Sequence, residues 1–260
     1  MKNQEFSLYE SVERALARWW MMVILMIIGG SAGWIFHLFY PPVYEAKAVI
    51  TINMDFEKRQ LTQYEEDYAF GTAGAIITSS EVKNLIITEA QVNGISINLP
   101  RIQRHFYLER KQSVWELRVR DQDPKVAAEL TNIWAEKATD ALNLALNHAL
   151  QAEQLQVQID GLENCLAGTP GQAALPQMDC KGFSQAEIQV MLQDRTEELV
   201  QEKKPSLGII PIMTIGLTEF ASVPEKPAIY GQADLVIAGA CIGLVVSLWV
   251  ISSLKVSHHD

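Results

Sequence analysis

Residue types that build catalytic and metal centres are scarce in this sequence. Only three cysteines and five histidines occur among its 260 residues, and they form no cluster with the spacing of zinc ligands. The nucleotide-binding motif G-x-x-x-x-G-K-[ST] and the metalloprotease motif H-E-x-x-H are absent. We therefore expect no catalytic, cofactor-binding or metal-binding residues, and a protein that acts through shape, assembly and contact rather than as an enzyme.

Basic residues are also too few for a protein that binds nucleic acid. The chain has 21 Lys and Arg against 31 Asp and Glu, which gives a formal net charge of −10. Nucleic-acid binding needs clustered Lys and Arg to displace counterions from the phosphates. The composition therefore argues against nucleic acid as a partner.

Two long apolar runs are present instead, one near each end of the chain. Trp19–Tyr40 and Leu235–Leu254 contain no Asp, Glu, Lys or Arg. A hydrocarbon core of ~30 Å needs ~20 helical residues at ~1.5 Å each, so each run can cross a lipid bilayer once. The alternative for the first run is a cleaved signal peptide with its cleavage zone at 29–33. Because the apolar run continues to Tyr40, beyond the ~7–15 residues of a signal peptide's apolar region, the sequence favours an uncleaved anchor.

Flanking charges predict the side of the membrane on which each segment lies. Lys2, Arg14 and Arg18 precede the first run, and Lys255 follows the second. Positively charged flanks stay in the cytoplasm, so both termini are expected there. The expected location is the bacterial inner (cytoplasmic) membrane, with two crossings and a central domain that is periplasmic or extracellular.

Small residues recur in both apolar runs. Gly29 and Gly33 in the first run, and Gly239 and Gly243 in the second, each form a small-xxx-small pair. Such pairs let two helix backbones approach closely in lipid, although glycine is also simply common in membrane helices. Both interpretations remain open from the sequence.

Two of the three cysteines lie between the apolar runs. Cys165 and Cys180 flank a stretch with Gly and Pro that forms neither helix nor strand. In an oxidising compartment we expect a disulfide between them, worth ~3 kcal/mol by chain entropy. Two free thiols are the alternative, and a metal site would need further ligands that the intervening residues do not supply.

The segment between the apolar runs begins with strand and short helix patterns. Apolar residues alternate along Tyr44–Met54, which predicts a half-buried strand. Residues 55–67 are polar and acidic, and we expect them to be irregular and solvated. Two further elements are expected. They are a helix from Ser79 to Asn93-Gly94 with Val82, Leu85, Ile86 and Ala90 on its apolar face, and a hairpin of Phe106–Glu109 and Val114–Val119.

A much longer helical pattern follows. Asp123 is a suitable N-cap with Pro124 at the first helical position, and apolar residues then recur at helical spacing as far as Leu162. Such length is typical of a coiled coil or a helical hairpin. Ser184 and Glu187 form a capping box that predicts a returning helix.

The expected fold class is α+β. Two transmembrane helices flank an extracytoplasmic domain with a membrane-proximal α/β base and a long helical hairpin. The β-rich stretch Ile209–Phe220 can pair with the strand at Tyr44–Met54, because both lie next to a span. The expected segments are 1–18 (cytoplasmic), 19–40 (first span), 41–123 (α/β base), 124–205 (helical hairpin with the Cys165–Cys180 tip loop), 206–234 (returning strand and proline segment), 235–254 (second span) and 255–260 (cytoplasmic tail).

Several short motifs occur along the chain in a fixed order. Residues 42–46 (Pro-Val-Tyr-Glu-Ala) lead into the first strand, residues 121–128 (Asp-Gln-Asp-Pro-Lys-Val-Ala-Ala) start the long helix, and Trp134 follows shortly after. A proline segment precedes the second span. This order resembles that of the polysaccharide co-polymerases, the Wzz-type chain-length determinant proteins.

The proline segment departs from the family pattern. Pro224 and Pro227 are present, and Tyr230 stands where family members often have a third proline. The prolines can serve as rigid, donor-free residues that stop a strand and direct the chain into the bilayer. Alternatively, the segment contacts the polymerase.

The resemblance implies a homo-oligomer that sets the length of O-antigen, capsular polysaccharide or exopolysaccharide made by a separate membrane polymerase. The growing glycan is a candidate further partner, and no cofactor is implied. The candidate residues for span packing or polymerase contact are Gly29, Gly33, Pro224, Pro227, Gly239 and Gly243.

Two alternative functions fit the same topology. The first is a membrane adaptor that activates a separate cytoplasmic tyrosine kinase, for which residues 255–260 offer little docking surface. The second is a two-span extracytoplasmic sensor, which would usually need a cytoplasmic output domain.

Overall fold

The structure is a computed structural model, which describes residues 19–57, 59–167 and 183–253. It contains two compact units. One comprises the described residues up to Glu45, Arg120–Ala127 and those from Pro224, and the other comprises those of Ala46–Val119 and Ala128–Val223. The elements in chain order are α2 (Trp19–Phe39), β1 (Tyr44–Met54), α3 (Gln63–Ile77), α4 (Ser80–Val92), α5 (Leu99–His105), β2 (Phe106–Lys111), β3 (Val114–Asp121), α6 (Pro124–Ala167), α7 (Gln185–Lys203), β4 (Met213–Glu219) and α8 (Gln232–Ser253).

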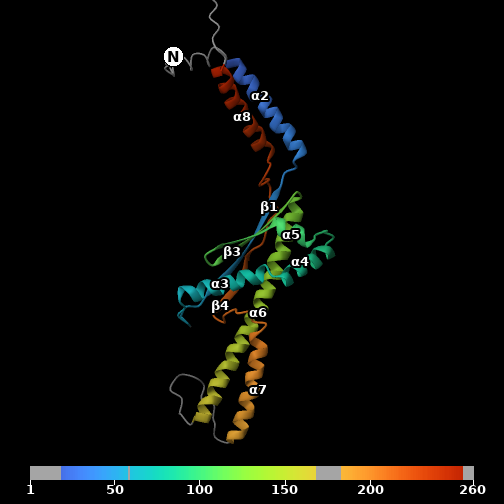
Figure 1. The fold of residues 1–260 in the computed structure, drawn as a ribbon. Coiled ribbons are helices and arrows are strands. Elements are labelled where there is room, and N and C mark those ends of the chain that lie inside the picture. Colours follow the sequence, from blue (N-terminus) through green and yellow to red (C-terminus); the bar gives the residue numbers. More distant parts are fainter. Residues whose placement is uncertain (1–18, 58, 168–182, 254–260) are drawn as a thin grey trace, which may run out of the picture. The chain divides into compact units, whose positions relative to one another are not determined.

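The two terminal helices α2 and α8 lie side by side (Figure 1). Both are long and apolar enough to cross a membrane. Large apolar side chains such as Ile27 and Ile242 remain more than half exposed, as expected of residues that face lipid. The structure confirms two candidate membrane helices, although α8 begins at Gln232, three residues before the expected start.

A four-stranded sheet with the strand order β2-β3-β1-β4 forms the β part of the fold. Strand β4 pairs antiparallel with β1, with Ile215 opposite Ile52 and Met213 opposite Met54. Strands β2 and β3 form the expected hairpin. The structure therefore confirms the expected pairing of the strand after the first apolar run with the strand before the second.

One face of the sheet carries the main apolar core. Ala48, Ile50 and Ile52 of β1 are fully buried. On the other face Lys47 and Asn53 are exposed and Thr51 is half-buried, and Val49 alone departs from the alternation of a half-buried strand. The ring of Trp115 on β3 lies so close to Gly74 of α3 that a side chain there would collide with it. On the same side, the ring N–H of Trp134 on α6 donates to the carbonyl of Ile77 at 3.1 Å.

Helix α3 corrects part of the expectation that residues 55–67 are irregular, because residues 63–67 are helical. It starts at Gln63 behind a capping box, in which the Glu65 amide donates to Thr62 Oγ1 at 3.3 Å and the Thr62 amide donates to Glu65 Oε2 at 2.8 Å. These backbone and side-chain hydrogen bonds from Thr62 lower the pKa of Glu65. The acidic residues therefore form a first helical turn, where the helix dipole favours negative charge.

Helix α4 agrees with the helix predicted from the sequence except at one residue. The Val82 amide donates to Ser79 Oγ at 3.2 Å, which confirms the N-cap, and Val82, Ile86 and Ala90 are buried. Leu85 is 43% exposed, so its place on the buried face is wrong. It lies one turn from Val82 at the edge of the face rather than at its centre.

The helices α6 and α7 form the expected hairpin (Figure 1). Helix α6 has 44 residues and continues through Gly161 to Ala167, a length of ~66 Å at ~1.5 Å per residue. The Ser184–Glu187 capping box of α7 is confirmed. Ala152 and Ile159 of α6 and Leu199 of α7 form a small buried cluster between the two helices.

Candidate functional site

The contact between α2 and α8 depends on the glycines. A β-carbon added at Gly29 would collide with the backbone carbonyl of Gly239, and one added at Gly243 would collide with the carbonyl of Leu25. At Gly33 the carbonyl of Leu235 occupies the same space. The small-xxx-small residues of both helices thus lie at a backbone-to-backbone contact, which favours the packing interpretation over the general abundance of glycine.

The letters of residues 29–33, Gly-Gly-Ser-Ala-Gly, also match the G-x-S-x-G motif of serine hydrolases. That motif works only when its serine is on a sharp turn between a strand and a helix. Ser31 lies inside α2 instead. The match is therefore no indication of a catalytic nucleophile.

Aromatic and polar contacts join the C-terminal end of α2 to the residues that directly precede α8. The rings of Phe36 and Tyr40 stack with centroids 4.1 Å apart, and the Tyr230 ring lies 6.0 Å from that of Tyr40. The ring Nδ1 of His37 is 3.2 Å from the carbonyl oxygen of Tyr230. Aromatic residues of this kind are common at membrane–water interfaces, where their rings span the polar and apolar layers.

The proline segment lies between β4 and α8, and Pro224 and Pro227 are half-buried in it. Directly after Pro227, the amide of Ala228 donates to the carbonyl of Val43 at 2.8 Å, and the Val43 amide donates to the carbonyl of Ile229 at 3.1 Å. The chain thus pairs briefly with the residues that follow α2 before it enters α8. This position fits rigid residues that direct the chain into the second span, and contact with a polymerase stays a prediction.

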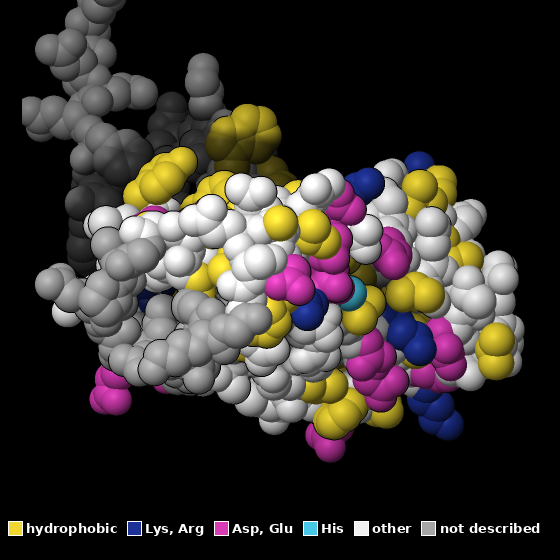
Figure 2. Space-filling model, turned by 90° about the horizontal axis from the view of Figure 1, so that it is seen from below, with side chains coloured by type: hydrophobic (Ala, Val, Ile, Leu, Met, Phe, Trp, Pro, Cys, Tyr) yellow, Lys and Arg dark blue, Asp and Glu magenta, His cyan; other side chains and the backbone are white. Residues whose placement is uncertain are grey.

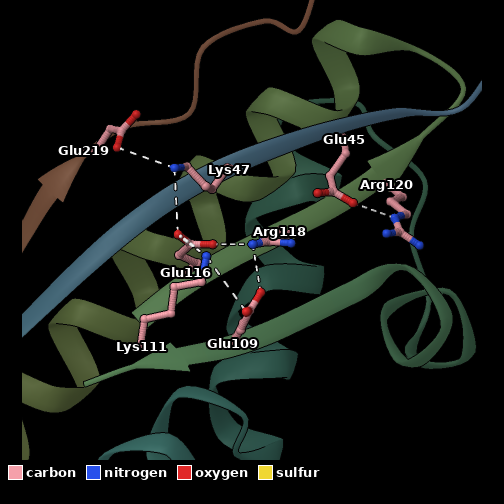
Figure 3. A network of polar contacts seen from close by, with 8 residues as sticks. All are labelled: Glu45, Lys47, Glu109, Lys111, Glu116, Arg118, Arg120 and Glu219. Atoms are coloured by element: carbon pink, nitrogen blue, oxygen red, sulfur yellow. Dashed lines mark hydrogen bonds and ion pairs between the residues drawn. The ribbon is translucent and has the colours of Figure 1, made fainter. Parts of the chain in front are cut away.

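A network of charged side chains lies on the face of the sheet opposite the core (Figure 3). Its centre is Glu116 of β3, whose side chain is 11% exposed. Glu116 binds Arg118, Lys111 Nζ at 3.0 Å and, more loosely, Lys47 Nζ at 3.9 Å. Arg118 also binds Glu109 at 2.7 Å. These bonds join β1, β2 and β3 through their side chains.

The network determines the charge state of Glu116. Hydrogen bonds from Arg118 and Lys111 hold its pKa at about 2, well below its ordinary value of 4.5, despite partial desolvation. Glu116 is therefore ionised at every physiological pH. It acts as a fixed anchor for two cations rather than as a group that exchanges protons.

A second ion pair lies in the unit that contains the terminal helices. Arg120 Nε donates to Glu45 Oε2 at 2.6 Å, and the two side chains are 32% and 20% exposed. Glu45 belongs to the Pro-Val-Tyr-Glu-Ala motif, and Arg120 directly precedes the Asp-Gln-Asp-Pro motif. The pair therefore connects the start of β1 with the segment that leads into α6.

The predicted disulfide falls partly outside the described residues. Cys165 is near the end of α6, and Cys180 lies outside the part of the chain that the structure describes. Cys241 in α8 is a free thiol. The bond between Cys165 and Cys180 therefore stays a prediction.

Among the described residues, no group of three or more His, Cys, Asp or Glu side chains is arranged to hold a metal ion. Of the groups that titrate there, Glu65, Glu116 and Glu187 have pKa values shifted from normal, all downward through hydrogen bonds. Sequence reasoning missed the Glu116 network. Its signal in the sequence is the position of Glu116 and Arg118 on the polar face of β3, opposite Trp115 and Leu117.

Of the comparisons with known proteins, only the comparison with solved structures gives matches. No family model matches the sequence, and no curated protein matches it. The chain is similar to a structure described as a full-length bacterial polysaccharide co-polymerase, at 10% identity and a TM-score of 0.39, over 98% of this chain and 100% of that one. It is also similar to the wild-type Shigella flexneri lipopolysaccharide O-antigen chain-length regulator WzzBSF, at 10% identity and a TM-score of 0.21, over 71% of this chain and 99% of that one.

Proposed function

We propose that this protein is a non-enzymatic regulator of polysaccharide chain length. It acts as a homo-oligomer beside a membrane polymerase, anchored in the bacterial inner membrane by α2 and α8. Both termini face the cytoplasm, and the sheet and the α6–α7 hairpin lie outside it. The polymer is O-antigen, capsular polysaccharide or exopolysaccharide.

The observation that carries this proposal is the position of the family-like motifs in the fold. Residues 42–46 join α2 to β1, and residues 121–128 join β3 to α6. Pro224 and Pro227 join β4 to α8. Each motif thus occupies a junction between a candidate span, the sheet and the long helix, and this placement supports a two-span protein with a domain between the spans.

The chemistry of the described residues supports a role without catalysis. The most strongly perturbed acid there, Glu116, stays ionised because it is paired with Arg118 and Lys111 in a structural network. A catalytic acid or base would instead need a pKa near the working pH and access to substrate. The charged groups of the sheet therefore stabilise its strands. In this proposal the protein regulates chain length through contact and assembly.

Deleting the gene in its host tests this proposal. The ladder of surface glycan on a gel should change its modal length while repeat units are still polymerised, and the wild-type gene on a plasmid should restore it. An unchanged ladder would contradict the proposal. Complete loss of polymer would also contradict it, because that result indicates a polymerase or an essential subunit.

The oligomer is tested separately on the purified protein. In detergent, light scattering or electron microscopy should show a ring-like assembly of several copies. A stable monomer at micromolar concentration would contradict the homo-oligomer.

A further inference from the structure

The helical hairpin carries a groove that is lined by glutamine side chains. Gln151, Gln154 and Gln158 come from α6, and Gln201 comes from α7. The spacing i, i+3 and i+7 places the three α6 residues on one face of the helix. Together with neighbouring residues they enclose a groove of about 400 Å³.

None of these four amides has a hydrogen bond with another of the described residues. Other glutamines of the hairpin do: Gln156 donates to Asp160 Oδ1 at 2.9 Å, and Gln193 donates to Glu197 at 3.3 Å. Each free amide offers two donors and an acceptor. The groove thus gathers hydrogen-bonding groups that the fold itself does not use.

One apolar residue lies among the polar residues that line the groove. This residue is Leu155, which packs against the buried cluster of Ala152, Ile159 and Leu199. A ligand that fits must therefore present an apolar surface toward Leu155 and polar groups toward the walls. A sugar ring has this character, because its C–H faces are apolar and its hydroxyl groups project from its edge.

The charged groups of the groove favour a neutral ligand. Its two acids are already engaged, since Glu198 accepts from Arg195 at 2.5 Å and Glu202 lies 2.6 Å from the His148 ring. No Lys or Arg is among the residues that line the groove. On the face of the molecule that Figure 2 shows, acidic and basic side chains are interspersed. An acidic polymer would meet two carboxylates there and no free cation.

We propose that this groove binds a short, neutral, hydroxyl-rich segment of glycan. The inference rests on the proposed function for the source of the glycan. The glutamine amides bond the hydroxyl groups, and Leu155 contacts the apolar face of a sugar ring.

Binding by the purified full-length protein in detergent tests the groove directly. The probe is the host's own surface polysaccharide, freed of lipid, cut to short oligomers and labelled with a fluorophore. The double variant Gln154→Ala/Gln158→Ala should bind it about 10-fold more weakly, as expected for the loss of two hydrogen-bonding groups. Alanine favours helix, so the variant should fold, and circular dichroism checks this.

Gln185→Ala/Gln189→Ala is the matched control. It removes two exposed glutamines of α7 that do not line the groove, and it should bind as the wild type does. Equal affinity of wild type and groove variant would overturn the inference, as would no binding by the wild type. A groove variant that changes the mass of the oligomer but not glycan affinity would show a contact between copies, and would overturn it as well.

The glycan ladder separates this inference from the proposed function. If deletion of the gene alters the ladder but the groove variant binds glycan normally, the groove inference fails and the function stands. If deletion leaves the ladder unchanged while the groove variant loses affinity, the function fails and the groove stands as a glycan site.

Discussion

Gly29 and Gly30 are neighbours in α2, and alanine should have opposite consequences at the two positions. A β-carbon at Gly29 would lie inside contact distance of the Gly239 carbonyl and 3.2 Å from the α-carbon of Gly243. At Gly30 the nearest atom is Cγ1 of Val236 at 3.7 Å, which is ordinary packing. Gly29→Ala must therefore push α2 and α8 apart, whereas Gly30→Ala fits.

Overpacking at a tight contact costs ~1–3 kcal/mol. For a chain of this size each kcal/mol lowers the unfolding midpoint by ~2–4 °C, so Gly29→Ala should unfold roughly 2–12 °C below Gly30→Ala. Both variants gain the same helix propensity from alanine, so the difference reports the packing alone. Thermal unfolding in one detergent, followed by tryptophan fluorescence, measures it. If Gly29→Ala unfolds at or above the midpoint of Gly30→Ala, the close approach of α2 and α8 is refuted.

Two further variants and one labelling experiment test other parts of the structure. Glu116→Gln removes the charge that binds Arg118 and should lower the free energy of unfolding at pH 7 by ~1–3 kcal/mol in urea denaturation. Because the pKa of Glu116 is lowered to about 2, the greater stability of the wild type should be lost as the pH falls from about 4.5 toward 2. If the difference in unfolding free energy between wild type and variant stays constant over this range, the network is contradicted. Ser184→Ala should cost ~1 kcal/mol by removing the N-cap of α7 and speed amide exchange in its first turn; unchanged exchange would count against the cap. Without reduction, a thiol reagent should label Cys241 and neither Cys165 nor Cys180 in denatured protein, and labelling of all three would disprove the disulfide.

Strong periodic signals made much of the fold predictable. The alternation along Tyr44–Met54 matches β1 to the residue, and the Ser184–Glu187 box marks the start of α7. Helix α3 escaped prediction because its first turn is polar and its exposed faces carry Tyr64 and Tyr68. Helix α5 has only seven residues, too few for a helical period to stand out.

The candidate site, too, was predictable from the sequence only in part. Glycines at spacing i, i+4 within an apolar run indicate a close helix contact without knowledge of the partner, and Gly29, Gly33 and Gly239 lie at one. The charged network around Glu116 depends instead on strand register, which places Glu109 directly opposite Glu116 across the hairpin so that Arg118 binds both carboxylates. Only the pairing of the strands reveals which charges meet, so sequence alone could not identify them.

The two-span topology is the claim on which the account depends, and reporter fusions measure it directly. Alkaline phosphatase, which is active only outside the cytoplasm, is fused after residues 60, 200 and 260 in separate strains. The account predicts high activity for the fusions after residues 60 and 200 and background activity for the fusion after residue 260. Background activity after residues 60 and 200 would place the sheet and the hairpin in the cytoplasm, which contradicts the account.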